Sequence, residues 1–164
     1  MIGKLKSAWK ALRSNFWGSL AVDVVLIIAI FALISMWQTR NLPGDEPAPP
    51  LDLAWLDDRS ASSIMPPGEV GVVYFFAPWC FYCRTSIDNL DELVASGKLP
   101  WARVVALDYE SLDEVREFLN ETDINLPVLL GGPNSSMDWN IRAFPTYFGM
   151  DESGLVARRA VGGV

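Results

Sequence analysis

Hydrophobic residues follow two patterns along the chain. Residues 16–37 are apolar apart from serine, glycine and Asp23, and a run of this length can cross the hydrocarbon core of a bilayer as one helix. Beyond residue 50, short apolar runs alternate with stretches in which apolar residues recur every three or four positions. The first pattern predicts a transmembrane anchor over 16–37, and the second predicts an α/β domain over 51–164.

The central feature of the second region is the apolar run Val70–Ala77 together with two cysteines that follow it. Its β-branched and aromatic residues predict a buried strand, and Pro78 ends this strand because proline donates no ladder hydrogen bond. Beyond Cys83, apolar residues recur at helical intervals, at Ile87, Leu90 and Val94. A helix is therefore expected to begin near Cys80.

Apolar runs of the same kind predict the other strands of the domain. Apolar runs indicate four of them, over 102–107, 126–130, 146–150 and 155–161. The last two are separated by Asp151–Gly154, which is a hairpin signal. Residues 51–56 form either a first edge strand or a short helix, and residues 57–68 are expected to be loop with at most one short strand.

Two more helices are expected. A capping box at Ser111–Glu114 begins the longer one, because a serine and an acid three residues apart can satisfy free N–H groups of the first turn. Its inward residues are expected to be Leu112, Val115, Phe118 and Leu119. A turn over 131–134 then leads into a short helix within 135–142.

The N-terminal residues 1–15 are basic and amphipathic. One helical face carries the apolar residues Ile2, Leu5, Trp9 and Leu12, and four cations lie between them. The segment is either a helix that lies on an anionic leaflet or an ordinary positive flank of the apolar run.

Charges on either side of the apolar run predict its orientation. Four cations precede the run, whereas Arg40, Asp45 and Glu46 follow it. The positive-inside rule therefore places residues 1–15 in the cytoplasm and the rest of the chain on the outer side of the membrane. A cleaved signal peptide is the alternative, but the run is long for one and no small-x-small site follows it directly.

Trp17 and Trp37 lie near the two ends of the run, where aromatic belts occur. Asp23 lies about one to two turns inside, so its carboxylate can reach the interface. Residues 38–50 are rich in proline and are expected to form an extended, semi-rigid linker that holds the domain off the membrane.

Composition excludes several kinds of chemistry. Beyond residue 40 the chain has eight basic and 19 acidic residues, a net charge of −11, so this part is expected to repel nucleic acid. Histidine is absent, which excludes a Ser–His–Asp triad, a Cys–His pair and a histidine-ligated metal. Cys80 and Cys83 are the only cysteines, so a zinc site would need carboxylate ligands or a dimer that shares four thiolates.

The placement of Cys80 and Cys83 favours redox chemistry instead. Free N–H groups and the helix dipole stabilise an anion at a helix N-terminus, and the thiolate is the reactive form of cysteine. The spacing lets two sulfurs on the first helical turn meet as a disulfide. One sulfur can attack a substrate and the other can resolve the mixed disulfide.

Two motifs together resemble the thioredoxin fold. They are Tyr74–Cys83, Tyr-Phe-Phe-Ala-Pro-Trp-Cys-Phe-Tyr-Cys, and Phe144–Phe148, Phe-Pro-Thr-Tyr-Phe. With the region between them, residues 66–161 resemble the membrane-anchored TlpA/ResA/DsbE-like thiol–disulfide oxidoreductases. The resemblance implies a thioredoxin-like α/β/α sandwich with a TlpA-type αβ insertion, preceded by one N-terminal transmembrane helix.

The resemblance also implies roles for residues at the cysteine motif. Cys80 would be the nucleophile and Cys83 the resolving thiol, with no cofactor beyond their redox-active disulfide. Trp79 would shield the sulfurs and offer a surface for the partner. The pair between the cysteines, Phe81 and Tyr82, would form an apolar docking surface.

In the second motif, Pro145 would be cis, with Phe144 beside the disulfide and its backbone available to pair with an extended substrate segment. Arg84, just after the cysteines, either favours the thiolates electrostatically or is an ordinary solvated arginine.

Three features depart from the resembled pattern. Thioredoxins usually carry a buried acid six positions before the first cysteine, where this chain has Tyr74, so proton handling must use water, another carboxylate or the tyrosine hydroxyl. The residues between the cysteines lack the histidine that stabilises the thiolate of oxidants. The usual C-terminal helix does not follow the last strand, so either the sequence is truncated or residues 51–65 or a partner cover that sheet face.

Together these features predict a single-pass protein of the bacterial inner membrane with a periplasmic thioredoxin-like domain. The resemblance implies that it reduces disulfides in exported proteins, including apocytochrome c before haem attachment, and that it is recharged by a membrane thiol-reductant transporter of the DsbD/CcdA type. The alternatives are a disulfide oxidant or isomerase, and a non-enzymatic adaptor. Potentials of related folds range from about −270 to −120 mV, so one or two hydrogen bonds decide the direction.

Overall fold

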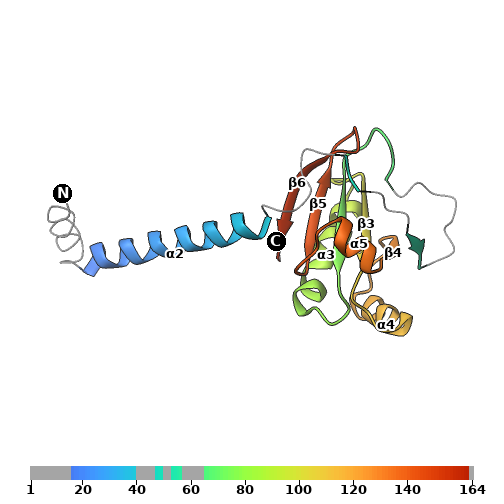
Figure 1. The fold of residues 1–164 in the computed structure, drawn as a ribbon, viewed down its shortest axis with the longest axis horizontal. Helices are drawn as coiled ribbons and strands as arrows, with labels where there is room; N and C mark the ends of the chain where they lie inside the picture. Colours follow the sequence, from blue (N-terminus) through green and yellow to red (C-terminus); the bar gives the residue numbers. More distant parts are fainter. Residues whose placement is uncertain (1–15, 40–46, 50–52, 57–64, 163–164) are drawn as a thin grey trace. The chain divides into compact units, whose positions relative to one another are not determined.

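A computed structural model describes residues 16–39, 47–49, 53–56 and 65–162 (Figure 1). The chain divides into two units, residues 1–40 and 41–164. In the first, helix α2 (Phe16–Thr39) contains an apolar stretch, Ser19–Trp37, that is long enough to cross a membrane, with a mean hydropathy of 2.6. The helix predicted over 16–37 is therefore present and ends two residues later. The predicted basic segment at 1–15 lies outside the described residues.

The second unit is built on one six-stranded sheet (Figure 1). Its strands are β1 (Ala54–Trp55), β2 (Gly71–Phe76), β3 (Trp101–Ala106), β4 (Val128–Leu130), β5 (Thr146–Met150) and β6 (Val156–Val161). The strand order is β1-β4-β3-β2-β5-β6. β2 pairs in parallel with β3 and antiparallel with β5, and β3 pairs in parallel with β4.

Strand β2 occupies a central position with side chains buried on both faces, which explains its nearly continuous apolar sequence. Tyr74 and Phe76 belong to the core on one face, whereas Val73 and Phe75 belong to the core on the other. A strand alternates its side chains between faces, so one short apolar run contributes to both cores.

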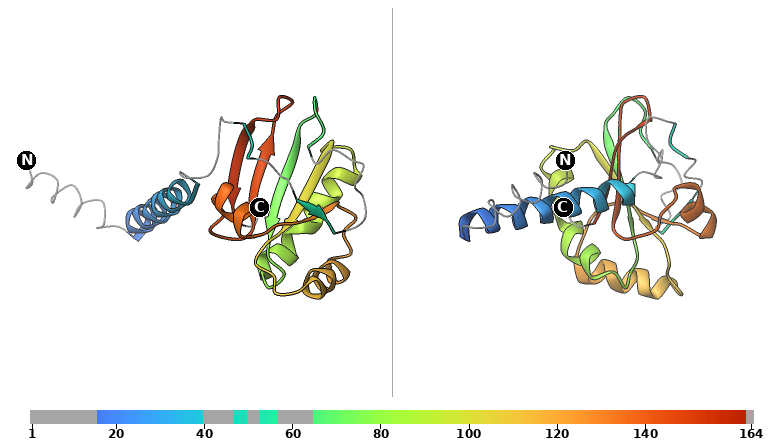
Figure 2. Two further views of the ribbon diagram at one scale, coloured as in Figure 1. Left: turned by 45° about the vertical axis from the view of Figure 1, so that its right-hand side comes forward. Right: turned by 60° about the vertical axis from the view of Figure 1, so that its left-hand side comes forward.

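Helices cover both faces of the sheet (Figure 2). α3 (Phe81–Ala95) and α4 (Leu112–Thr122) place Ile87 and Phe118 in the core with Tyr74 and Phe76. α5 (Pro133–Asp138) and the residues after it place Trp139 in the opposite core. The α/β/α sandwich predicted from the sequence is confirmed, with α4 and β4 in the predicted insertion.

The structure changes two local predictions, one at strand β1 and one at the start of α4. Ala54 pairs with Leu130, so the segment 53–56 contains an edge strand and the short-helix alternative is wrong there. Leu112 was expected to face inward but is 40% exposed. It is the first residue of α4. Its cap, Ser111, accepts a hydrogen bond from the Glu114 amide as predicted.

The return half of that capping box is displaced by one residue, because the Glu114 carboxylate accepts from the amide of Glu110 and not of Ser111. The turn expected over 131–134 is shorter than predicted. α5 begins at Pro133, since a proline at the first helical position gives up a donor that would have no partner in the helix.

The linker predicted over 38–50 contacts the domain before its expected end. Pro47 forms a bridge with Leu155, and the Ala48 amide donates to the Gly154 carbonyl at 3.4 Å. Residues 53–56 lie at the β4 edge of the sheet, and most of the rest of the segment 51–65, the one proposed to cover the sheet face, lies outside the described residues. Within the described residues, an open apolar groove lies between α3 and β6.

Candidate functional site

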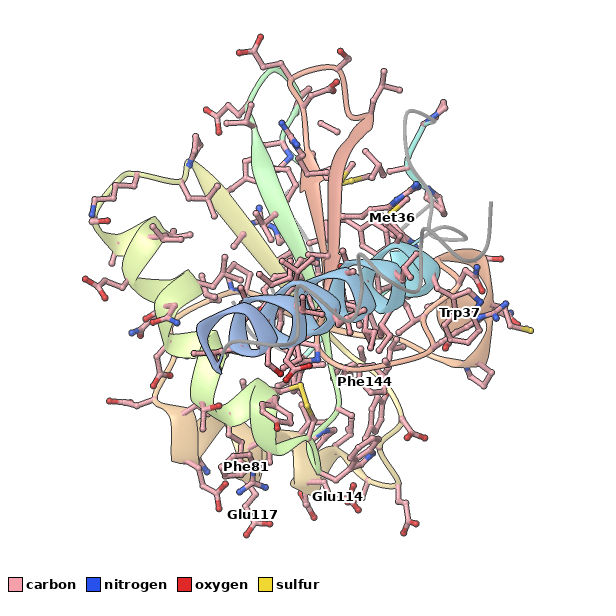
Figure 3. The ribbon with its side chains drawn as sticks, turned by 90° about the vertical axis from the view of Figure 1, so that its left-hand side faces the viewer. Met36, Trp37, Phe81, Glu114, Glu117 and Phe144 are labelled. Carbon is pink, nitrogen blue, oxygen red and sulfur yellow. A yellow bond between two sulfur atoms is a disulfide. The ribbon has the colours of Figure 1, made fainter. Side chains whose placement is uncertain are left out.

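The two cysteines lie where the buried strand β2 gives way to α3. Cys80 is the N-cap of α3 with an extended backbone, and Cys83 is in its first turn. The two form a disulfide with their Cα atoms 5.2 Å apart. Figure 3 shows this disulfide in yellow at the end of α3 that carries Phe81. Only Cys80 retains any exposure, 4%, and Cys83 is fully buried, so an incoming disulfide meets Cys80 first.

The backbone at this helix end is arranged to favour negative charge on Cys80. The Cys83 amide donates to Cys80 Sγ at 3.1 Å. First-turn amides have no acceptor inside the helix, and together with the helix dipole they stabilise an anion. Once the disulfide opens, the same amide can therefore stabilise the Cys80 thiolate, which is the attacking species.

Arg84 makes its contacts with groups other than the two sulfurs. Its guanidinium pairs with the Glu121 carboxylate, donates to the Pro78 carbonyl at 3.1 Å and lies 5.8 Å above the Phe118 ring. The sequence left two alternatives, a charge that favours the thiolates or a solvated arginine; the side chain is 40% exposed, and its charge is paired with Glu121. The arginine joins α3 to α4, and Glu121 offsets its charge.

Trp79 is held over the site by the loop that follows β3. Its indole N–H donates both to the Asp108 carbonyl, at 3.2 Å, and to the Asp108 carboxylate, at 3.1 Å. Its ring packs edge to face on Phe144, with the centroids 5.7 Å apart. Asp108 adopts a positive φ of 52°, which aspartate tolerates better than most residues. Trp79 is nevertheless 63% exposed, so it can also contact a partner.

The loop before β5 completes the site. The Phe144–Pro145 peptide bond is cis as predicted, and the Thr146 end of β5 pairs with Phe75, one residue before the end of β2. Because β5 runs antiparallel to β2, its first residue lies at the end of the sheet where β2 meets the cysteines. Phe144 and Trp79 are thereby brought into contact although 65 positions separate them in the sequence.

Aromatic side chains between the cysteines point outward. Phe81 is 70% exposed and Tyr82 is 65% exposed, and their rings lie 5.8 Å apart. Exposed aromatic residues of this size are typical of binding surfaces. With Trp79, they form what we call the aromatic surface of the site.

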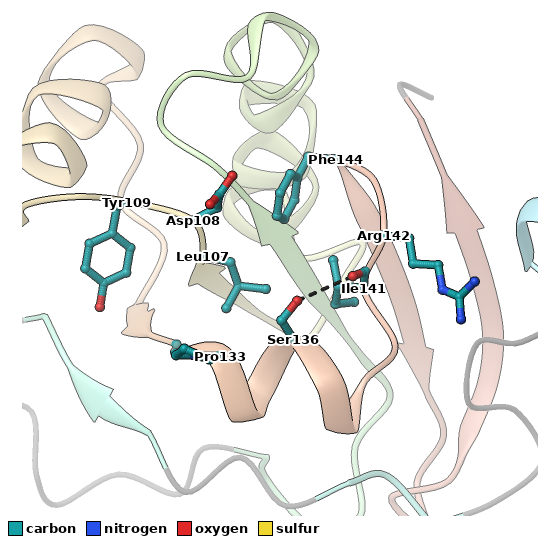
Figure 4. A pocket seen from close by; sticks show the side chains of 10 residues that line it. Leu107, Asp108, Tyr109, Pro133, Ser136, Ile141, Arg142 and Phe144 are labelled. Carbon is teal, nitrogen blue, oxygen red and sulfur yellow. Dashed lines mark hydrogen bonds between the residues drawn. The ribbon is translucent and has the colours of Figure 1, made fainter.

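A pocket of about 600 Å³ adjoins this surface (Figure 4). It lies between the residues after β3, the Gly131–Gly132 turn, α5 and the loop before β5. Asp108 and Phe144, which hold Trp79, line one side, and Arg142 lines another. The pocket therefore combines apolar walls with one charge of each sign.

Tyr74 occupies the position of the usual buried acid. Its ring is fully buried, and its hydroxyl lies 3.2 Å from Ser86 Oγ and 3.4 Å from the Cys83 carbonyl oxygen. Burial raises the pKa of the Tyr74 phenol far above its ordinary value, although the Ser86 hydrogen bond opposes the shift. Tyr74 is therefore a neutral hydroxyl at any pH at which the protein works.

Sequence reasoning missed three residues of the site, Asp108, Ser86 and Tyr147. Ser86 has a signal in retrospect, since it is a polar residue on the inward face of α3, one position before the buried Ile87. Asp108 directly follows a buried strand. Tyr147 carries no local signal, because only the pairing of β5 with β2 places it opposite Tyr74. Within the described part of the chain, no group of three or more His, Cys, Asp or Glu residues could hold a metal.

The Asp108 clamp on Trp79 can be tested by substitution. We expect Asp108→Ala to lower the rate of exchange with a peptide disulfide about fivefold, because one hydrogen bond of about 1 kcal/mol to the indole is lost and alanine disfavours the positive φ. Asp108→Asn keeps an acceptor and tolerates that φ, so it should retain most of the rate. Equal rates for the alanine variant and the parent would contradict a role for the clamp.

Several known proteins resemble this chain. The thioredoxin-like protein YneN of Bacillus subtilis is 27% identical over 152 residues, which are 87% of this chain and 89% of YneN. The thiol:disulfide interchange protein DsbE of Escherichia coli K12 is 24% identical over 163 residues, with coverage of 87% and 84%. The predicted relationship to thiol–disulfide oxidoreductases is thereby confirmed.

Solved structures and a family model agree with this relationship. A thiol:disulfide interchange protein of the thioredoxin family from Chlorobium tepidum superposes with a TM-score of 0.60 at 26% identity, covering 74% of this chain and 88% of that one. A thiol-disulfide isomerase from Corynebacterium glutamicum gives 0.59 at 19% identity, with coverage of 73% and 88%, which shows the fold. The AhpC/TSA family model matches residues 45–159. Since this match extends from before β1 into β6, the chain belongs to the AhpC/TSA family.

Proposed function

We propose that this thiol–disulfide oxidoreductase is a membrane-tethered reductase that opens disulfides in exported proteins, apocytochrome c among them. The observation that carries the proposal is the environment of the nearly buried Cys80. Its sulfur accepts a hydrogen bond from the Cys83 amide, and exposed aromatic rings lie around it. That arrangement suits attack on a disulfide presented by another protein. The names of YneN and DsbE support the same class of reaction.

The reaction proceeds in two exchanges. The Cys80 thiolate attacks one sulfur of the substrate disulfide, a Cys80–substrate disulfide forms, and the other substrate sulfur leaves as a thiolate. The Cys83 thiol then loses its proton and attacks Cys80 Sγ. This attack restores the Cys80–Cys83 disulfide and releases the second substrate thiolate, so two electrons pass from the protein to the substrate.

Substrate binding uses the surface around Cys80. An extended segment can pair with the backbone beside Pro145. The aromatic surface of Trp79, Phe81 and Tyr82 supplies apolar contact to the substrate. The Asp108–Arg142 pocket is large enough for side chains that flank the substrate cysteine. Recognition by backbone and apolar contact tolerates many sequences, as a reductase of several exported proteins requires.

The electrostatics favour the reducing direction. A strong oxidant of this fold has a reduced form that is unusually stable. Here Glu121 offsets the charge of Arg84, histidine is absent from the sequence, and the thiolate relies on backbone amides. Weaker stabilisation of the reduced form lowers the reduction potential, so the dithiol gives up electrons more readily.

We propose that the apolar helix α2 is the tether, and the charge bias around it in the sequence supports a domain on the periplasmic side of the bacterial inner membrane. A reductase there needs electrons from the cytoplasm. We therefore propose that a membrane thiol-reductant transporter of the DsbD/CcdA type recharges the Cys80–Cys83 pair.

Trapping variants test the cysteine roles. Cys83→Ala removes the resolving thiol, so Cys80 should accumulate mixed disulfides with exported proteins, which non-reducing gels and mass spectrometry of the adducts would identify. Cys80→Ser should abolish exchange while the thermal unfolding midpoint stays close to that of the parent.

The double variant Cys80→Ser, Cys83→Ala is the matched control and should trap nothing. An adaptor that binds its partner without exchange would leave the Cys83→Ala protein free of adducts, and that result contradicts the proposal.

The direction is tested by the reduction potential of the full chain in detergent, equilibrated with glutathione redox buffers. We expect a value nearer the −270 mV of thioredoxin than the −120 mV of DsbA. A value near −120 mV would assign the protein to the oxidants.

Orientation is tested by labelling. A membrane-impermeant maleimide added to cells with a permeabilised outer membrane should modify Cys80 after mild reduction. In a background without native cysteines, Ser7→Cys should stay unlabelled until the inner membrane is lysed. Labelling of Ser7→Cys while the inner membrane is still intact would show the opposite topology.

A further inference from the structure

The peptide group between Tyr82 and Cys83 is hydrogen-bonded at both of its ends. Its amide, that of Cys83, donates to Cys80 Sγ at 3.1 Å. Its carbonyl, that of Tyr82, accepts from Ser86 Oγ at 2.7 Å. The two ends belong to one resonant unit with partial double-bond character. The Ser86 hydroxyl is therefore linked to the reactive sulfur through a single peptide group.

The Ser86 hydroxyl is held in the orientation that this link requires. A serine hydroxyl has one proton and two lone pairs, and the proton of Ser86 goes to the Tyr82 carbonyl. The Tyr147 hydroxyl donates to Ser86 Oγ at 3.4 Å, and the Tyr74 hydroxyl lies 3.2 Å from it, where it meets a lone pair and so donates as well. The Ser86 proton is thereby kept on the carbonyl.

Packing keeps these partners in place. Ser86 is only 7% exposed and Tyr74 is fully buried. The rings of Tyr74 and Tyr147 pack edge to face with their centroids 4.8 Å apart. Thr85 Oγ1 also reaches the Tyr82 carbonyl, at 3.2 Å, but Thr85 is exposed, so water can replace that contact. Ser86 is the donor on the buried side.

A donor at the carbonyl strengthens the bond that the amide makes at the sulfur. Hydrogen bonds in a chain polarise one another, so the amide proton becomes a better donor. An ionised acceptor gains more from such a donor than a neutral one does. The Cys80 thiolate therefore gains more than the thiol or the disulfide sulfur, and stabilising the charged form lowers the pKa of the Cys80 thiol.

We propose that Ser86 is a positioning residue that strengthens the hydrogen bond from the Cys83 amide to the Cys80 thiolate and so enlarges the reactive fraction of Cys80. This inference deepens the proposed function and rests on it. Ser86 acts through the Tyr82–Cys83 peptide group, and Tyr74 and Tyr147 act by orienting Ser86.

Substitution of Ser86 isolates this contribution, because serine carries no charge. The elements that build the site carry the following charged and titratable groups: Tyr74 of β2, Tyr82, Cys83 and Arg84 of α3, Asp108 after β3, Glu121 of α4, Arg142 before β5 and Tyr147 of β5. All of them remain in a Ser86 variant. A change in the titration of Cys80 therefore reports the altered hydrogen-bond chain.

The titration of Cys80 is measured in the full chain in detergent. A Cys83→Ala background keeps the amide and leaves Cys80 as the single thiol. The rate of alkylation by iodoacetamide is followed across pH, and its midpoint gives the pKa of Cys80. We expect Ser86→Ala to raise that midpoint by roughly 0.3 units, as a gain of 10–30% in a charge-assisted hydrogen bond implies.

Two variants distinguish the hydroxyl from its packing. Ser86→Thr keeps a hydroxyl that can bond a carbonyl of the preceding turn, so it should retain the parent midpoint. Tyr147→Phe keeps Ser86 but removes one donor to it, so it should raise the midpoint by less than Ser86→Ala does. The matched control is Thr122→Ala, which removes a hydroxyl that donates to the Phe118 carbonyl at 2.9 Å within α4. It should leave the Cys80 midpoint unchanged.

A second measurement uses the chain with both cysteines, equilibrated with glutathione buffers. Above the Cys80 midpoint, loss of the Ser86 hydroxyl destabilises the thiolate of the reduced form. The equilibrium should then shift about twofold toward the Cys80–Cys83 disulfide, which is 0.3 units converted. Well below the midpoint Cys80 is a thiol in both proteins, so parent and Ser86→Ala should agree. A purely structural role would change the equilibrium equally at both pH values.

An unchanged Cys80 midpoint in both Ser86→Ala and Tyr147→Phe would overturn the inference. An equal shift in Thr122→Ala would also overturn it, by showing that any lost helix hydroxyl has the same effect. The proposed function fails differently. If parent protein in the Cys83→Ala background forms no adduct with oxidised glutathione at any pH, thiol–disulfide exchange itself is absent, whatever Ser86 does to the titration.

Discussion

The functional end of the molecule depends on one contact, the hydrogen bond from the Cys83 amide to Cys80 Sγ. It exists because β2 ends at Phe76, just before Pro78, and Cys80 is the N-cap of α3, so that a sulfur takes the place of the usual N-cap oxygen. The backbone thereby offers charge stabilisation that needs no side chain. Glu121 pairs with the nearby Arg84, so the hydrogen bond that reaches the sulfur comes from the backbone.

Sheet topology assembles the remainder of the site around that sulfur. Parallel pairing places the end of β3 beside the end of β2, and antiparallel pairing places the start of β5 there as well. Asp108, Phe144 and Pro145 follow or precede those strand ends, so they meet Trp79 at the same end of the sheet. The binding surface is thus a consequence of strand direction, with rigid strands holding short loops in position.

Beneath the site, a neutral hydroxyl replaces a carboxylate. Burying an ionised group without a partner is far more costly than burying a hydrogen-bonded hydroxyl, so Tyr74 lets the core stay apolar around the disulfide helix. The Tyr74 hydroxyl is joined by hydrogen bonds to Ser86, and Ser86 to Tyr147, so three separate elements meet there.

Local patterns in the sequence were sufficient for much of this protein. The apolar length of α2, the alternation of strands and helices, the cysteine spacing and the Phe144–Pro145 motif predicted the apolar helix, the fold and the position of the disulfide, because each depends on neighbours in the chain. Only the tertiary structure decided that Arg84 pairs with Glu121, that Asp108 holds Trp79, that Leu112 faces solvent and that Tyr147 reaches Ser86. These contacts join residues on different elements, and the pairing of strands and packing of helices that bring them together leave no trace in the periodicity of any one segment.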